Sequence, residues 1–196
     1  MPIWIGDRLI LAAPADPEYL RQDPRAILMS AGQAFGTGTH PTSQMCLVEL
    51  QAHLQEGDRV LDVGSGSGIL AIAAARLGAG TVVAIDRSVP ACRVAHANVS
   101  RNELAKVVTV LAGTPEVFGP GARFDLVLAN LDTAADGAYW LPTLSRLCRR
   151  GGKIVLSGFQ SPGEGRVQQA LEEANLARLA RRSQETWITL VLGKPA

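Results

Sequence analysis

The chain has 196 residues, a formal net charge of +1 and a mean hydropathy of +0.13, which indicate one globular fold with a sizeable core and exclude a nucleic-acid module held by bulk charge. No apolar run is long enough to span a bilayer, and the first residues lack the cationic start of a secretion signal. Three widely spaced cysteines, Cys46, Cys92 and Cys148, favour buried thiols in a reducing cytoplasm over disulfides, and no Cys/His spacing indicates a metal site.

The first 33 residues predict a hairpin and a loop packed on the rest of the chain. Residues 4–11 read as two short strands joined at Gly6 and Asp7. Residues 13–25 contain three prolines and predict a loop, and residues 27–29 predict a short strand. We therefore expect a division into residues 1–33 and a larger domain at residues 34–196.

Residues 34–43 combine two glycines with four hydroxyl side chains, which gives an adaptable backbone rich in hydrogen-bonding groups. Pro41 suits the first turn of a helix that we expect to reach about residue 54. The apolar face of this helix comprises Cys46, Leu47, Leu50 and Leu54. An ordinary capping loop with Thr39 as N-cap is the alternative, but it leaves Phe35 and the second glycine unexplained.

A glycine-rich turn follows the next predicted strand, residues 60–63. Gly64, Gly66 and Gly68 precede a helix at about residues 69–77, whose free N–H groups and dipole favour an anion. The dinucleotide fingerprint would need a third glycine where Ile69 stands, so the G-x-G-x-G pattern favours a smaller anion such as an amino-acid carboxylate. A plain chain reversal is the alternative.

Asp86 ends the following strand, residues 82–85, about 20 residues beyond the glycine turn. A carboxylate at this spacing accepts hydrogen bonds from ribose hydroxyls. Capping of the helix that begins near Val89 is the alternative role, for which Ser88 competes. Together the turn and Asp86 indicate a nucleoside cofactor and favour S-adenosylmethionine.

The remaining chain alternates strands with helices. Helices are expected at residues 89–102, 141–150 and 164–174, and Gly151-Gly152 is expected to end the second. Strands are expected at residues 107–111, 124–129, 153–157, 177–181 and 186–192. The short link between the last two predicts antiparallel pairing. The fold class is therefore α/β, a doubly wound Rossmann-like, mostly parallel seven-stranded sheet with an antiparallel last strand and helices on both faces.

Four positions fall at the carboxyl ends of successive predicted strands, where ligands bind in such sheets: Gly64, Asp86, Gly113 and Asn130. This constellation indicates one shared site more strongly than any single motif does.

The strand and turn with Asp62 and Gly64 to Gly68, together with Asp86, resemble motif I and its acidic partner in class I S-adenosylmethionine-dependent methyltransferases. The stretch from Ala34 to Thr42 is more specific and resembles the signature of ribosomal protein L11 methyltransferases. Residues 4–9, 156–158 and 185–187 also match, so the resemblance covers nearly the whole chain.

The resemblance implies site residues. Asp86 would bind the ribose, Gly64 would approach the methionine part, and Asn130 would face the methyl group and the incoming amine. Phe35, Thr37 and Thr39 would line the same pocket, and Ser43 stands where a cofactor-contacting Thr is usual. The expected catalytic residues are Asn130, Thr39 and His40. The expected cofactor-binding residues are Phe35, Thr37, Ser43, Asp62, Gly64, Ser65, Gly66, Gly68, Asp86, Arg87, Gly113, Thr114 and Asn130.

The implied function is methylation of protein amino groups, with a ribosomal protein as partner, in the cytoplasm and without membrane or direct nucleic-acid binding. Family members carry a separate N-terminal recognition domain, and this chain begins at the hairpin that follows it. The family segment after the strand-end Asn is apolar, whereas Leu131-Asp132-Thr133 stands here. A small-molecule methyltransferase and a non-catalytic cofactor-binding module remain the alternatives.

Overall fold

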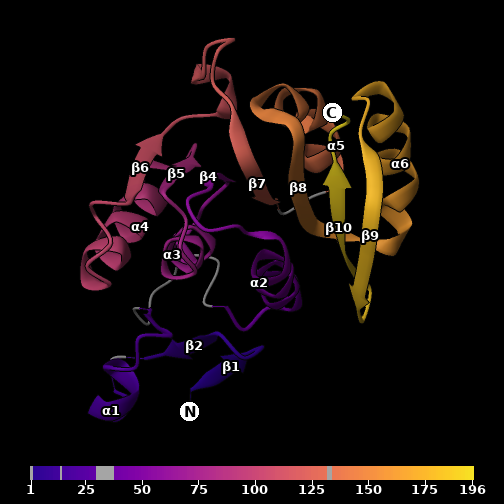
Figure 1. Cartoon of the computed structure of the whole chain (residues 1–196). Helices are drawn as coiled ribbons and strands as arrows, with labels where there is room; N and C mark the ends of the chain where they lie inside the picture. The colour runs from indigo at the N-terminus through magenta and orange to yellow at the C-terminus, as the bar shows by residue number, and fades with distance from the viewer. Residues whose placement is uncertain (1, 14, 30–37, 132–133) are drawn as a thin grey trace.

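The computed structural model describes the chain except residues 1, 14, 30–37 and 132–133, and gives only the backbone of residues 134–138. The described residues form a three-stranded sheet near the N-terminus and a seven-stranded sheet, which lies above the smaller one in Figure 1. The elements are β1 (Ile3–Ile5), β2 (Leu9–Ala12), α1 (Glu18–Arg21), β3 (Ala26–Leu28), α2 (Pro41–His53), β4 (Arg59–Val63), α3 (Ile69–Arg76), β5 (Thr81–Asp86), α4 (Val89–Arg101), β6 (Val108–Ala112), η1 (Pro115–Val117), β7 (Phe124–Asn130), α5 (Ala134–Leu147), β8 (Cys148–Gln160), η2 (Ser161–Gly163), α6 (Glu164–Glu173), β9 (Ala177–Gln184) and β10 (Trp187–Gly193).

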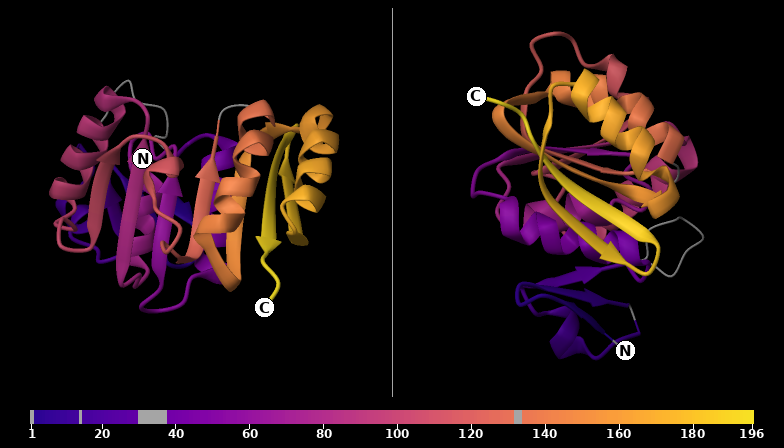
Figure 2. Two further views of the ribbon diagram at one scale, coloured as in Figure 1. Left: turned by 90° about the horizontal axis from the view of Figure 1, so that it is seen from above. Right: turned by 90° about the vertical axis from the view of Figure 1, so that its right-hand side faces the viewer.

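The large sheet has the order β6-β5-β4-β7-β8-β10-β9. β4, β5, β6, β7 and β8 pair in parallel, while β10 runs antiparallel to both β8 and β9. Helices cover both faces of the sheet, with α5 and α6 on the side away from α2 and the N-terminal sheet (Figure 2). The predicted Rossmann-like fold with an antiparallel last strand is confirmed.

Each face of the large sheet has its own apolar core. One core joins α2 and α3 to the sheet and extends to Ile5, Leu9 and Ile27 of the small sheet. The other joins α5 and α6 to the opposite face. Among the described residues, no helix is long and apolar enough to cross a membrane.

The N-terminal hairpin and the short third strand form as predicted, β2 pairing antiparallel with β1 and parallel with β3. The loop expected at residues 13–25 contains one helical turn, α1, so that prediction is wrong in part. The expected division after residue 33 falls outside the described residues and stays a prediction.

The helix expected at residues 141–150 begins seven residues earlier and ends at Leu147. Pro142 lies inside α5 rather than in its first turn. Gly151 and Gly152 do not end the helix but form an irregularity within β8, where the pairing with β7 shifts register. At the junction of α5 and β8, the Lys194 Nζ donates to Ser145 O of α5 at 2.7 Å and to Cys148 O of β8 at 3.0 Å.

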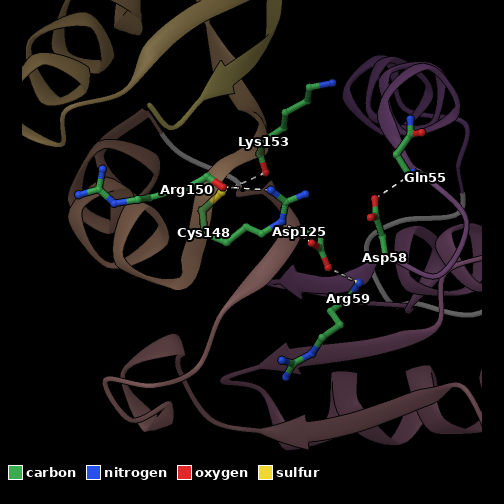
Figure 3. Close-up of polar contacts among 8 residues, drawn as sticks. Gln55, Asp58, Arg59, Asp125, Cys148, Arg150 and Lys153 are labelled. Carbon is green, nitrogen blue, oxygen red and sulfur yellow. Dashed lines mark hydrogen bonds and ion pairs between the residues drawn. The ribbon is translucent and has the colours of Figure 1, made fainter. Parts of the chain in front are cut away.

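The amino ends of the central strands carry a polar cluster (Figure 3). Asp125 accepts a hydrogen bond from the backbone N–H of Arg59 at 2.8 Å and pairs with the Arg149 side chain. These contacts and the Arg149 charge lower the pKa of Asp125 against the opposing effect of burial, which is the largest single influence. The cluster joins β4, β7 and β8 at the end of the sheet opposite to the strand tips described next.

Candidate functional site

A cavity of about 770 Å³ lies at the carboxyl ends of the central parallel strands. Predicted site residues from four successive strand ends and from the start of α2 meet in its wall: Ser43, Asp62, Gly64, Ser65, Gly66, Asp86, Arg87, Gly113, Thr114 and Asn130. The topology brings these residues together because parallel strands place all their carboxyl ends at one edge. Since β4 is central in the sheet order, the glycine turn lies between the Asp86 and Asn130 ends of the cavity.

The glycine turn is shaped by positive φ angles of 68°, 53° and 81° at Gly64, Gly66 and Gly68. Its amides bind within the chain: Gly64 and Ser65 donate to Ile85 O at 2.9 and 3.2 Å, and Gly68 donates to Ser65 O at 2.7 Å. These three amides are therefore used within the chain, and the predicted anion contact of the helix N–H groups that follow stays a prediction.

The glycines of the turn instead allow close packing. A Cβ at Gly64 would lie 2.5 Å from Leu131 Cδ2, so the missing side chain lets Leu131 cross the turn. A Cβ at Gly68 would lie 3.1 Å from that of Ala95 in α4, and Gly68 is not in the cavity wall. Gly68 therefore permits the close packing of α3 against α4, and its predicted cofactor contact stays a prediction.

Asp86 links the turn to its own strand end. Its Oδ2 accepts from the Gly66 N–H at 2.9 Å, and its Oδ1 accepts from the Ser88 N–H at 2.8 Å. The N-cap of α4 is Ser88, whose Oγ accepts from Ala91 N–H at 3.3 Å, so capping does not account for Asp86. Each carboxylate oxygen has a further lone pair available, which suits ribose hydroxyls.

Asp62 is a buried carboxyl in the cavity wall, 1% exposed. Burial raises its pKa to about 7, although a hydrogen bond from the Ala71 N–H at 3.1 Å lowers it, and the nearby Asp86 charge raises it further. A low-dielectric site with two carboxylates favours a ligand that carries positive charge.

Asn130 lies at the tip of β7 and lines the cavity beside Ser43 and Leu131. Its Nδ2 donates to Ser43 Oγ at 3.4 Å. The chain beyond it is fixed by Leu131, whose N–H donates to Ser157 O at 3.1 Å, and by Gly158, where a Cβ would lie 1.8 Å from Leu131 O. Only glycine at position 158 therefore permits this course of the chain.

Ser65 supplies a direct sign that the cavity accepts a ligand. Its hydroxyl is buried and has no hydrogen-bond partner among the described residues, although Ser65 lines the cavity. An unpaired buried hydroxyl is costly and calls for an explanation such as a bound molecule. The donor set therefore fits a nucleoside with a charged amino-acid part.

The structure places two predicted catalytic residues outside the cavity wall. His40 is the N-cap of α2: its Nδ1 accepts from the Thr42 N–H at 3.4 Å and lies 2.8 Å from Thr42 Oγ1. Its ring meets Trp187 edge-on at 4.7 Å. Thr39 is exposed and is not the N-cap. Phe35 and Thr37 lie outside the described residues, so their roles stay predictions, as do those of the other site residues.

Sequence reasoning missed the apolar wall of the cavity. Ile69, Leu70, Pro90, Val94, Leu131 and Trp140 contribute to it. Trp140 comes from α5, whose start was misplaced in the sequence analysis, so no signal connected it to the site. Leu131 directly follows Asn130 and was accessible to the same strand-end reasoning.

Known proteins resemble this chain over nearly its full length. A family model described as ribosomal protein L11 methyltransferase (PrmA) matches residues 1–195. The chain is 37% identical over 218 residues to the ribosomal protein L11 methyltransferase of Chloroflexus aurantiacus, covering 97% of this chain and 65% of that protein. The first curated relatives are covered over 60% to 65% of their own length.

Solved structures show the same fold. The crystal structure of ribosomal protein L11 methylase from Lactobacillus delbrueckii subsp. bulgaricus aligns with a TM-score of 0.87 at 27% identity, covering 100% of this chain and 99% of that one. The structure of SMU.776 complexed with SAH aligns with a TM-score of 0.66 at 14% identity, over 79% of this chain and 50% of that one, which concerns the fold alone.

Proposed function

The chain belongs to the ribosomal protein L11 methyltransferase family, and from this premise we propose that it is an S-adenosylmethionine-dependent methyltransferase that methylates amino groups of a protein. Because the chain spans about 60% to 65% of the length of its first curated relatives, the activity, the cofactor and the ribosomal protein substrate are all parts of this proposal.

The observation that carries the proposal is the meeting of the glycine turn, Asp86 and Asn130 in one cavity. A ligand that spans this cavity has its ribose at Asp86 and its amino-acid part along the turn and Asp62. S-adenosylmethionine supplies an activated methyl group on a positively charged sulfur. The two carboxylates and the unpaired Ser65 hydroxyl support a ligand with this charge and these hydrogen-bonding groups.

The residues at the Asn130 end have two tasks in such a reaction. The Asn130 side-chain oxygen is an acceptor that can orient an amine N–H toward the methyl group. Leu131 and Trp140 give this end an apolar wall that limits water. Alignment of the nucleophile and exclusion of water account for much of the acceleration of a displacement of this kind.

The test is incubation of the purified protein with methyl-labelled S-adenosylmethionine, ribosomal protein L11 and a fractionated cell extract. We expect label on protein amino groups, and on L11 before other proteins. Label confined to small molecules would favour a small-molecule methyltransferase. Binding of S-adenosylhomocysteine without any transfer would favour a cofactor-binding module, and binding of NAD alone would refute the proposal.

We also propose a cytoplasmic location. The three cysteines, Cys46, Cys92 and Cys148, are free and buried, as the sequence predicted. Burial raises the pKa of the Cys46 thiol to about 12, which keeps it neutral and unreactive. Buried free thiols are typical of proteins from a reducing compartment.

A further inference from the structure

Ser43 of α2 and Asn130 of β7 are 87 residues apart in the chain and meet in the cavity wall. Ser43 lies in the first turn of α2 and is 1% exposed. Its hydroxyl oxygen accepts a hydrogen bond from Asn130 Nδ2. This is the one polar contact of the Asn130 side chain within the described part of the chain.

In the structure this contact accompanies one orientation of the Asn130 amide, with Nδ2 toward Ser43 Oγ. The oxygen and nitrogen of an amide group lie on opposite sides of Cγ and have opposite hydrogen-bonding roles. With Nδ2 held by Ser43, Oδ1 is turned away from α2 and has no partner among the described residues. An unheld amide would present either its acceptor or its donor to the cavity.

Both partners of this contact are fixed by their surroundings. The backbone of Asn130 pairs with Ser157 of β8, and Gly158 permits the close passage of Leu131. Ser43 is held in place because His40 caps the first turn of α2 and the His40 ring contacts Trp187. One turn beyond Ser43, Cys46 is fully buried beside the hydroxyls of Ser157 and Thr189. Neither side chain can therefore drift from the other without disturbing a packed element.

We propose that Ser43 is a positioning residue, which holds Asn130 Nδ2 and thereby presents Asn130 Oδ1 as the acceptor for an N–H of the methyl-accepting group. The inference rests on the proposed function for its chemistry. It assigns Ser43 an action through Asn130, in addition to the cofactor contact that the family resemblance implies.

The proposal is tested with four variants. Ser43→Ala removes the hydroxyl, and Ser43→Thr keeps it. Asn130→Ala removes the group on which Ser43 is proposed to act. Ser145→Ala is the matched control. It also deletes a buried serine hydroxyl that has one hydrogen bond among the described residues, from Oγ to Ala174 O at 2.9 Å, and Ser145 is not in the cavity wall.

The first readout needs no activity. In the protein labelled with ¹⁵N-asparagine, the side-chain NH₂ signals of Asn130 are those absent from Asn130→Ala. We expect these signals to shift and to exchange faster with water in Ser43→Ala, and to stay near their wild-type positions in Ser43→Thr and Ser145→Ala. Unchanged Asn130 signals in Ser43→Ala would overturn the proposal, whether or not the protein is an active methyltransferase.

The second readout is a double-mutant cycle on methyl transfer. Ser43→Ala should lower kcat about three- to tenfold, the range expected for one uncharged hydrogen bond, with Ser43→Thr restoring it. In the Asn130→Ala background the same substitution should have no further effect on kcat. Equal losses in both backgrounds, with weaker cofactor binding, would assign Ser43 to the cofactor alone and overturn the proposal. Absence of methyl transfer by the wild type would instead refute the proposed function, and the first readout would then decide the positioning role.

Discussion

At the scale of single residues, Asp86 connects the glycine turn to the ligand. Replacing it with Ala removes the acceptor for Gly66 N–H and Ser88 N–H together with the proposed ribose contact. We expect the affinity for S-adenosylhomocysteine to fall at least about tenfold, because hydrogen bonds to a charged group contribute about 1.5–3 kcal/mol each. Isothermal titration measures this change.

Asp125→Asn is the control for the Asp86 substitution. Asp125 also accepts a backbone N–H and lies in a strand of the same sheet, but at the opposite end (Figure 3). Its substitution should leave the affinity unchanged. Equal losses in the two variants would mean that Asp86 acts through the stability of the sheet rather than through the ligand.

Asp62 gives the ligand-free protein a characteristic dependence of stability on pH. Burial raises its folded-state pKa from 3.8 to about 7. Between these values the folded protein keeps a proton that the unfolded chain has lost, so the free energy of unfolding falls as pH rises, and the loss is complete above pH 7. Asp62→Asn should lack this contribution, which is on the order of a few kcal/mol.

Urea denaturation of wild type and Asp62→Asn from pH 5 to pH 8 measures this effect, since the other titrating groups cancel in the difference. The stability of the wild type should decline relative to the variant across this range. Parallel curves would show that Asp62 is not a buried, proton-binding carboxyl in the folded state.

At the scale of elements, the close passage between β8 and the chain after β7 positions Asn130. Gly158→Ala would place a Cβ 1.8 Å from Leu131 O at a residue with φ of 93°. We expect the free energy of unfolding to fall by about 3 kcal/mol or more, and Asn130 to be displaced. Thermal unfolding and methyl transfer are the measurements.

Gly165→Ala in α6 is the matched substitution. A Cβ there meets nothing within 4 Å. Its free energy of unfolding should stay unchanged or rise by up to about 1 kcal/mol, because Ala is the better helix former. If Gly158→Ala were tolerated equally well, the close passage would not fix the tip of β7.

The elements whose signals are local could be predicted from the sequence. Element boundaries that depend on a contact with a residue distant in the chain could not. β4, α3 and β5 follow from buried apolar strands and a glycine turn, all within 28 residues of chain. The end of α5 did not follow, because Lys194, 47 residues beyond Leu147, binds carbonyls at the junction of α5 and β8. Gly151-Gly152, a helix stop by local rules, lies in a strand for the same reason.

The same contrast holds for the candidate site. Asp86 and Asn130 could be predicted as site residues because each follows a strand, and a parallel sheet brings the carboxyl ends of its strands to one edge. The contact of the His40 ring with Trp187 could not be predicted, because Trp187 lies 147 residues away in the chain, and the catalytic role that the resemblance implies for His40 stays a prediction. The glycine turn was predicted from its local pattern, but the hydrogen bonds from its Gly64 and Ser65 amides to Ile85 O, across the sheet, were not.

At the scale of the whole molecule, two amide side chains connect the N-terminal sheet to the helices that pack on the large sheet. Asn102 at the end of α4 donates to Leu28 O and accepts from Leu28 N–H, both at 2.9 Å. Gln51 of α2 donates to Ile5 O at 3.0 Å and accepts from Arg8 N–H at 3.3 Å. Each side chain pairs with the backbone of the small sheet much as a neighbouring strand would.

Asn102→Ala should loosen this attachment. It leaves the N–H and C=O of Leu28 unpaired, at a cost of about 1–3 kcal/mol for a buried group. Hydrogen exchange at β3 should become at least about fivefold faster, while exchange in β4 stays unchanged. Gln22→Ala, which removes an exposed contact to Glu18, is the control and should alter neither strand. Faster exchange throughout the protein would mean that Asn102 stabilises the whole fold instead.

The crystal structure of the protein with S-adenosylhomocysteine tests the central claim most directly. We predict a single ligand in the cavity at the strand tips, its ribose hydroxyls on Asp86, its sulfur facing Asn130, and a hydrogen-bond partner for Ser65 Oγ. A ligand bound elsewhere, or a cavity that stays empty at a saturating concentration, would contradict the account.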